Sequence, residues 1–113
     1  MVTINPSTEL FTLINLFCVQ PEQQKQLANL LEHATDSVIQ HLDGFVSASI
    51  HSSKDGTTVV NYAKWESEGK FEAMKLEENA IEHMKEAAKL AISFNPIVCN
   101  VVSSHSHDSQ THG

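Results

Sequence analysis

The chain has 113 residues, enough for one domain, and its 14 acidic residues exceed its seven lysines, so its formal net charge is −7 with no arginine present. This charge repels nucleic acid and anionic lipid, and no stretch is long and apolar enough to span a membrane. The few glycines form neither a dinucleotide fingerprint nor a phosphate-binding loop, so we expect no nucleotide cofactor. The first residues lack the basic region of a signal peptide, so we expect a cytoplasmic protein.

The first part of the chain predicts an arm, a strand and a helix. Residues 1–10 contain an Asn-Pro-Ser-Thr run and are expected to be extended, and residues 11–19 form an apolar strand. Because that strand is apolar on both faces, we expect one face to lie under helices and the other under a second subunit. Pro21 suits the first turn of a helix that runs to about Leu42, where Gly44 ends it.

A hairpin over residues 45–65 carries the most suggestive pair of side chains. Alternate residues of a strand share a face, so Asn61 and Trp65 project from the same side. One interpretation is a site that uses the amide and the indole; the other is a core tryptophan beside a satisfied buried amide. Strand parity groups His51 with Phe45 and brings it near Asn61, either as a site residue or as a solvated histidine at a strand end.

The rest of the domain predicts two helices and a last strand. Ser67 is expected to cap a short helix that contains Phe71 and Met74. A longer helix follows from about Glu77, and Asn95-Pro96 is expected to break the pattern before a strand over residues 97–102. The buried face of the longer helix is expected to consist of Ile81, Met84, Ala88 and Ala91.

The order of elements predicts an α+β fold of the ferredoxin-like type, a split βαβ (βαββαβ) arrangement with a four-stranded antiparallel sheet and helices on one face. The domain is expected to cover residues 11–103, followed by a polar tail over residues 104–113. The first and last strands keep apolar side chains for the other face, which predicts a homodimer paired through its sheets. These side chains are Ile14, Leu16, Val98 and Val102.

The histidines and cysteines do not predict a metal site. His33 and His41 are too far apart along one helix to share an ion, and the close pair in the tail has no fixed geometry. Cys18 and Cys99 lie in different strands and are expected to be buried thiols, although neighbouring strands would make a disulfide conceivable. The histidines of the tail are His105, His107 and His112.

The run from His51 to Trp65, with its Asp-Gly turn and Asn-Tyr-Ala-Lys-Trp sequence, resembles the signature hairpin of the antibiotic biosynthesis monooxygenase family. The resemblance extends over about residues 9–103. It implies a dimeric α+β barrel with a cavity between each sheet and its helices. Some members oxidise polycyclic phenols to quinones with dioxygen and without metal, flavin or haem. By position, Asn61 and Trp65 match their catalytic residues, and His51 matches a residue that relays a proton.

The resemblance also names the residues around the substrate and the places where this chain departs from the pattern. Quinone-forming members have a tyrosine at Phe71 and an arginine at Lys85. We therefore expect a cofactor-independent monooxygenase acting on a phenol-like or hydroquinone-like aromatic molecule. The substrate-binding candidates are Tyr62, Phe71, Met74, Asn15 and Lys85.

Two alternatives remain open. Haem-degrading relatives of this fold use an asparagine, a tryptophan and a haem-binding histidine, and Asn15 and His83 lie roughly where the first and last would be. Met74 stands near the tryptophan position. The other alternative is a non-enzymatic dimer that binds a small hydrophobic molecule or serves as a stress accessory protein.

Overall fold

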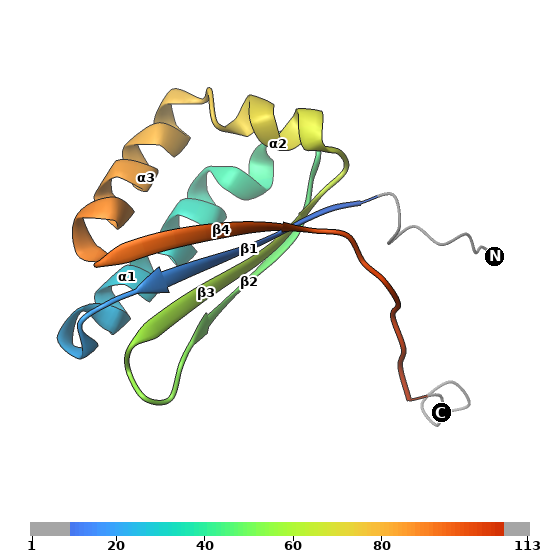
Figure 1. Ribbon diagram of the computed structural model, residues 1–113. Helices are drawn as coiled ribbons and strands as arrows, with labels where there is room; N and C mark the ends of the chain where they lie inside the picture. The colour runs from blue at the N-terminus through green and yellow to red at the C-terminus, as the bar shows by residue number, and fades with distance from the viewer. Residues whose placement is uncertain (1–9, 108–113) are drawn as a thin grey trace.

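The computed structural model describes residues 10–107, which form one sheet with helices against one face (Figure 1). The strand order is β2-β3-β1-β4, and all three strand pairs are antiparallel. The predicted ferredoxin-like α+β fold is therefore confirmed. In chain order the elements are β1 (Phe11–Cys18), α1 (Pro21–Ser37), the short 3-10 helix η2 (Ile39–His41), β2 (Phe45–Ser52), β3 (Thr58–Trp65), α2 (Glu68–Met74), α3 (Glu78–Leu90) and β4 (Ser93–Cys99).

Local chemistry sets several of these boundaries. α1 ends before the predicted Leu42, at the point where the backbone of Val38 leaves helical geometry, and the hydroxyl of Ser37 donates to the main-chain oxygen of His33. Gly44 has a φ of 89°, and a side chain there would collide with Lys70 of α2. Ser67 caps α2 as predicted, accepting from the main-chain nitrogen of Lys70 at 3.2 Å.

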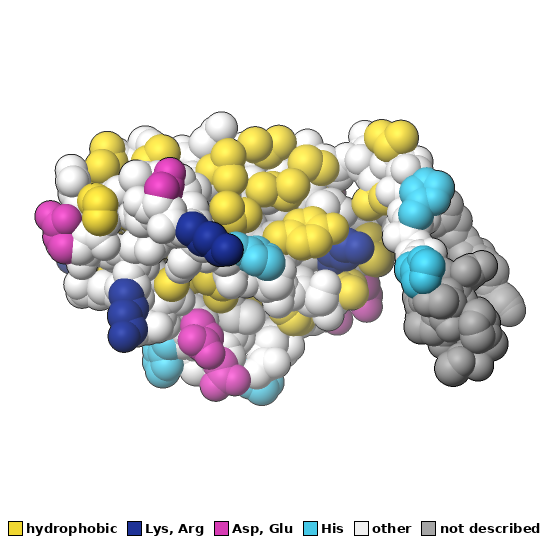
Figure 2. Space-filling model, turned by 90° about the horizontal axis from the view of Figure 1, so that it is seen from below, with side chains coloured by type: hydrophobic (Ala, Val, Ile, Leu, Met, Phe, Trp, Pro, Cys, Tyr) yellow, Lys and Arg dark blue, Asp and Glu magenta, His cyan; other side chains and the backbone are white. Residues whose placement is uncertain are grey.

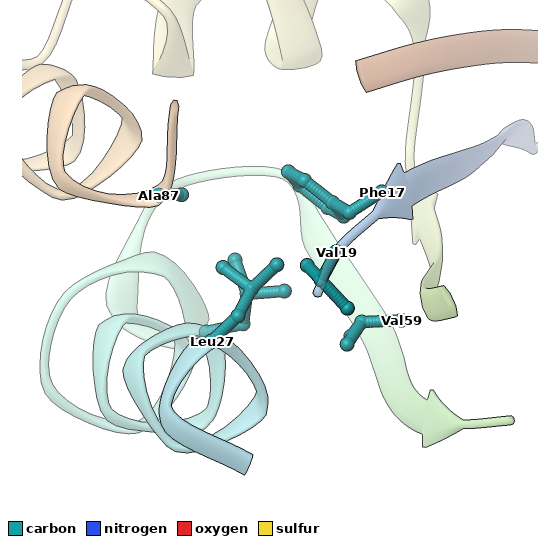
Figure 3. Close-up of a cluster of buried hydrophobic side chains, with 6 residues drawn as sticks. Phe17, Val19, Leu27, Val59 and Ala87 are labelled. Atoms are coloured by element: carbon teal, nitrogen blue, oxygen red, sulfur yellow. The ribbon is translucent and has the colours of Figure 1, made fainter. Parts of the chain in front are cut away.

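The core consists of two groups of buried side chains between the sheet and the helices. In the first, Leu27 of α1 points toward Val19 and Val59, with Ala87 of α3 beside them (Figure 3). The second surrounds Trp65, whose side chain is 1% exposed, near α2. Strand alternation therefore directs both Val59 and Trp65 toward the helices, and for Trp65 this is the direction that the resemblance implied.

The opposite face of the sheet, which we call the outer face, is partly apolar and uncovered in a single chain. Figure 2 shows hydrophobic side chains spread over this face, with lysine and histidine among them. Ile14 of β1 pairs with Ile97 of β4 on this face, and Tyr62 of β3 pairs with Ile14 from the other side. Tyr62 and Ile97 are 37% and 39% exposed.

The structure corrects the predicted last strand. β4 begins at Ser93 and contains Pro96, where the sequence predicted a break. Proline is tolerated because β4 is an edge strand, so its missing N–H interrupts no second ladder. The register of β4 against β1 also corrects a face assignment: Val98 pairs with Leu13 and lies on the helix side, so its prediction as an outer-face residue is wrong. Val102 lies beyond β4.

The structure also locates the two cysteines and the described parts of the two ends of the chain. Cys18 pairs with Ser93 and Cys99 pairs with Thr12, so the two thiols lie at opposite ends of neighbouring strands and are free. Cys18 is exposed, contrary to prediction. The predicted arm lies almost wholly outside the described residues, as does His112 of the tail. Residues 104–107 belong to neither a helix nor a strand.

Within residues 10–107 no helix has both the length and the apolar character needed to cross a bilayer. The same part of the chain contains no group of three or more histidine, cysteine or acidic side chains placed to hold a metal ion.

Candidate active site

A cavity of about 560 Å³ lies between the helix side of the sheet and helices α2 and α3. Strands β1 and β3 form its floor, where Asn15, Asn61 and Trp65 are exposed to it together. Most of the lining is apolar, and the polar groups are few. A mostly apolar cavity with a small number of polar groups is the usual form of a binding site for a small organic molecule.

Two carboxamides lie side by side on the cavity floor. Asn15 of β1 is the direct partner of Asn61 of β3 in the sheet, and both side chains line the cavity. The Oδ1 atoms of both are buried, and neither has a hydrogen-bond partner within residues 10–107. A buried polar atom left unpaired costs about 1–3 kcal/mol. The prediction of a satisfied amide at Asn61 is therefore not met, and the pair is placed to bind a polar group of a ligand.

Aromatic side chains close one end of the cavity. Trp65 contacts Phe45 edge to face at 5.5 Å between ring centres and Phe71 at 6.2 Å. Phe71 in turn stacks on Phe11 at 5.1 Å. This packing fixes the orientation of the tryptophan, so the wall that it presents to the cavity is preformed.

Charged side chains lie on the α2 and α3 side of the cavity. Lys75 forms an ion pair with Glu72 at 3.2 Å, and its Nζ lies 5.2 Å from the centre of the Phe71 ring. Lys85 and Glu68 also line the cavity, and neither has an ion-pair partner within residues 10–107. These two groups are thus the unpaired charges of the site.

Helix α3 contributes its wall in a different way from the prediction. Ile81, Met84 and Ala88 were expected in the core, but they line the cavity and are only partly covered. The side chains packed most deeply are Ala80 and Ala87. Their small size brings the helix close to its neighbours, and the larger residues beside them then border open space.

Two predicted site residues do not reach the cavity. A β-bulge between Phe45 and Ser47 shifts the strand alternation, so that Ile50, not His51, is the partner of Asn61. His51 lies on the outer face, where its Nε2 is 2.9 Å from the Oγ of Ser49. The expected proximity of His51 to Asn61 is therefore wrong.

Tyr62 also occupies the outer face, with the Nζ of Lys64 5.7 Å from its ring centre. Of the other candidates, Asn15, Phe71, Met74 and Lys85 all line the cavity. His83, the candidate haem ligand, does not line it and instead faces His33 of α1.

Comparison with known proteins identifies the family of the chain. The family model for antibiotic biosynthesis monooxygenases matches residues 10–89, which include the cavity floor and most of α3. The chain belongs to the antibiotic biosynthesis monooxygenase family. It is 44% identical over 104 residues to tetracenomycin-F1 monooxygenase of Streptomyces glaucescens, covering 92% of each chain.

Solved structures of other proteins share the fold. The ActVA-Orf6 monooxygenase of Streptomyces coelicolor, in complex with nanaomycin D, has a TM-score of 0.78 at 24% identity. The superposition covers 91% of this chain and 96% of the ActVA-Orf6 chain. SnoaB, a cofactor-independent oxygenase from Streptomyces nogalater, has a TM-score of 0.71 at 16% identity. The superposition covers 85% of this chain and 96% of the SnoaB chain. These likenesses support the ferredoxin-like fold.

Proposed function

We propose that the protein is a cofactor-independent monooxygenase that oxidises an electron-rich aromatic molecule, a phenol or hydroquinone, with dioxygen. The observation that carries this proposal is the pair of carboxamides of Asn15 and Asn61, each with an unpaired Oδ1, on the floor of a mostly apolar cavity. The named activity of the relative that is 44% identical, a monooxygenase, supports the same reaction class.

The chemistry needs a site that favours the phenolate and excludes water. In the proposed reaction, the phenol loses a proton and the ring passes electrons to dioxygen. One oxygen atom then forms a carbonyl on a ring carbon, and the other leaves as water with the single hydrogen of that carbon and the proton first lost from the phenol. The side-chain N–H groups of Asn61 and Asn15 would donate to the developing oxygen anions, which is the role of preorganised donors in acyl-transfer enzymes.

The remaining roles follow from position in the cavity. The face of Trp65 would pack on the aromatic ring of the substrate, and Phe71 and Met74 would border it. Lys85 would offer a cation to an anionic oxygen at the cavity wall. Because His51 lies on the other face, we propose Glu68 as the proton acceptor, since it is the cavity carboxylate without an ion-pair partner in the described region.

We further propose that two copies pair through their outer faces as a homodimer. The support is the row of apolar side chains that a single chain leaves partly uncovered, including Ile14, Tyr62 and Ile97. Burying such a row would remove apolar surface from water at about 25 cal/mol per Å². A cytoplasmic location is part of the proposal, and the two free thiols support it, because disulfides are rare there.

Oxygen uptake by metal-free protein tests the reaction, using a panel of anthrones and naphthols as substrates. We expect catalysed uptake with at least one of them, and we expect Asn61→Ala to lose a factor of about 10²–10³ in rate while remaining folded. Ser49→Ala, which removes an exposed hydroxyl from the outer face, is the matched control and should keep the rate. Uptake equal to the uncatalysed rate across the panel would refute the proposal.

A second function is favoured by one observation. Phe71 lines the cavity and carries no hydroxyl to exchange a proton. A protein with the same cavity could therefore bind an aromatic molecule without oxidising it. Fluorescence quenching of Trp65 by panel members, without oxygen uptake, would support this binding function over the monooxygenase.

A further inference from the structure

Two histidines from different helices face each other outside the cavity. His33 lies in the last turns of α1 and His83 in the middle of α3, and their ring centres are 5.8 Å apart with the planes inclined by 57°. Helices α1 and α3 pack against each other over the sheet (Figure 1). His83 is half-buried and His33 is exposed, so water and ions can reach the pair.

The ring of His83 is held in a form that suits metal binding. Its Nδ1 lies 2.9 Å from the main-chain oxygen of Asn79, one helical turn earlier. A carbonyl oxygen only accepts hydrogen bonds, so Nδ1 carries the hydrogen, and in the neutral ring Nε2 is the nitrogen left to bind a metal. Histidines that bind metal commonly donate their other N–H to a carbonyl in this way, which fixes both the tautomer and the ring orientation.

The distance between the rings is compatible with one shared ion. Imidazole nitrogens bind zinc at about 2.0–2.1 Å, so two nitrogens on the same ion are at most about 4 Å apart. Rings whose centres are 5.8 Å apart reach this separation when their nitrogens point toward each other. His33 is exposed, so its side chain can rotate to turn one ring nitrogen toward the held ring of His83.

We propose that His33 and His83 form a two-histidine site for a divalent transition-metal ion, with water in the remaining positions. Imidazole ligands suit zinc, nickel and copper and do not suit magnesium. The ion would link α1 to α3, the helix that places Met84 and Lys85 in the cavity wall. Metal would therefore brace the candidate active site without entering it, and the proposal does not depend on the reaction proposed above.

Thermal unfolding of the full-length protein with zinc chloride tests the site. An ion that binds the folded state alone stabilises it in proportion to the logarithm of its concentration, and at about 100 times the dissociation constant we expect the Tm to rise by roughly 10 °C. Magnesium should produce no shift. His33→Ala and His83→Ala should each abolish the zinc-dependent shift, because each removes one of the two ligands.

Two controls separate this site from other histidines. His41→Ala should keep the shift, since His41 lies outside the pair. The triple alanine variant of the tail should also keep it, because none of these histidines belongs to the pair, and zinc that binds the folded and unfolded states equally leaves the Tm unchanged. The residues of this triple variant are His105, His107 and His112.

Several results would overturn the proposal. They are the absence of a zinc-dependent rise in Tm, its persistence in His33→Ala, or its loss only in the tail variant. Should His83→Ala fail to fold, calorimetric titration of zinc into His33→Gln in the tail-variant background decides the matter. The proposal requires that one binding event per chain disappears there.

Discussion

Replacing Asn61 by leucine should make the protein more stable and less active at the same time. The Oδ1 atom of Asn61 is buried and has no hydrogen-bond partner within residues 10–107. Leucine has a similar size and no polar atom, so the variant removes the cost of that unpaired oxygen. It also removes the donor that we propose for the developing oxygen anion. The two effects come from different atoms of one amide, since the unpaired Oδ1 lowers the stability and the N–H group is the proposed donor.

The size of each effect can be worked from the structure. An unsatisfied buried acceptor costs about 1–3 kcal/mol, so the free energy of unfolding should rise by an amount in this range. For a domain of this size, 1 kcal/mol corresponds to roughly 4–8 °C in Tm. Loss of one preorganised donor should lower the rate by about 10²–10³. Asn15→Leu should behave in the same way, since Asn15 is the partner of Asn61 and its Oδ1 is also unsatisfied.

Thermal unfolding and oxygen uptake are measured on the same preparations. Thr12→Val is the matched control: the Oγ1 of Thr12 is buried and unsatisfied as well, but Thr12 does not line the cavity. This variant should raise the Tm and keep the activity. The reasoning is refuted if Thr12→Val raises the Tm while Asn61→Leu lowers it, because Asn61 must then have a partner in the native protein.

Four further outcomes are expected. Ile14→Asp should convert the proposed dimer to a monomer or unfold it, which sedimentation at micromolar concentration measures, because a buried charge without a partner costs several kcal/mol; a wild-type monomer would contradict the pairing. His51→Ala should keep at least half of the oxygen-uptake rate, because His51 lies on the outer face. A large loss of rate would show that His51 takes part in the reaction. Phe71→Tyr should raise that rate if a tyrosine hydroxyl at this position helps to move a proton, and an unchanged rate would exclude that role. Asp55→Asn should lower the Tm at neutral pH, because hydrogen bonds from Ser53 and Thr57 hold the pKa of the Asp55 carboxyl below its usual 3.8. The difference in Tm between this variant and wild type should fade as the pH drops through that lowered pKa. A difference that stays constant with pH would show that the charge of Asp55 is not its cause.

The order of elements could be predicted because each one leaves a local signal. Alternation in residues 57–65 showed that Asn61 and Trp65 share a face, and the structure places both on the cavity floor. Pro21 and Ser67 marked the starts of α1 and α2. Local signals of this kind depend on spacing within one element, which the sequence displays directly.

Contacts between elements could not be predicted in the same way. Asn15 was a candidate only through a resemblance, because its pairing with Asn61 depends on the register between β1 and β3, which are 40 or more residues apart in the chain. The extent of β4 was also misjudged, since Pro96 reads as a break unless the strand is known to lie at an edge. The pair formed by His33 and His83 required the packing of two helices.

The bulge in β2 explains why a correct rule gave a wrong face for His51. Counting from Phe45 by twos puts His51 on the same side as Phe45, and Phe45 does line the cavity. One extra residue, Val46, lies between Phe45 and Ser47 in the pairing with β3, so every later residue of β2 changes sides relative to that count. Ala48 and Ile50 thus face the helices, with Ala48 in the cavity wall. Ala48 is the partner of Ala63, and its small side chain leaves open the cavity space beside Asn61.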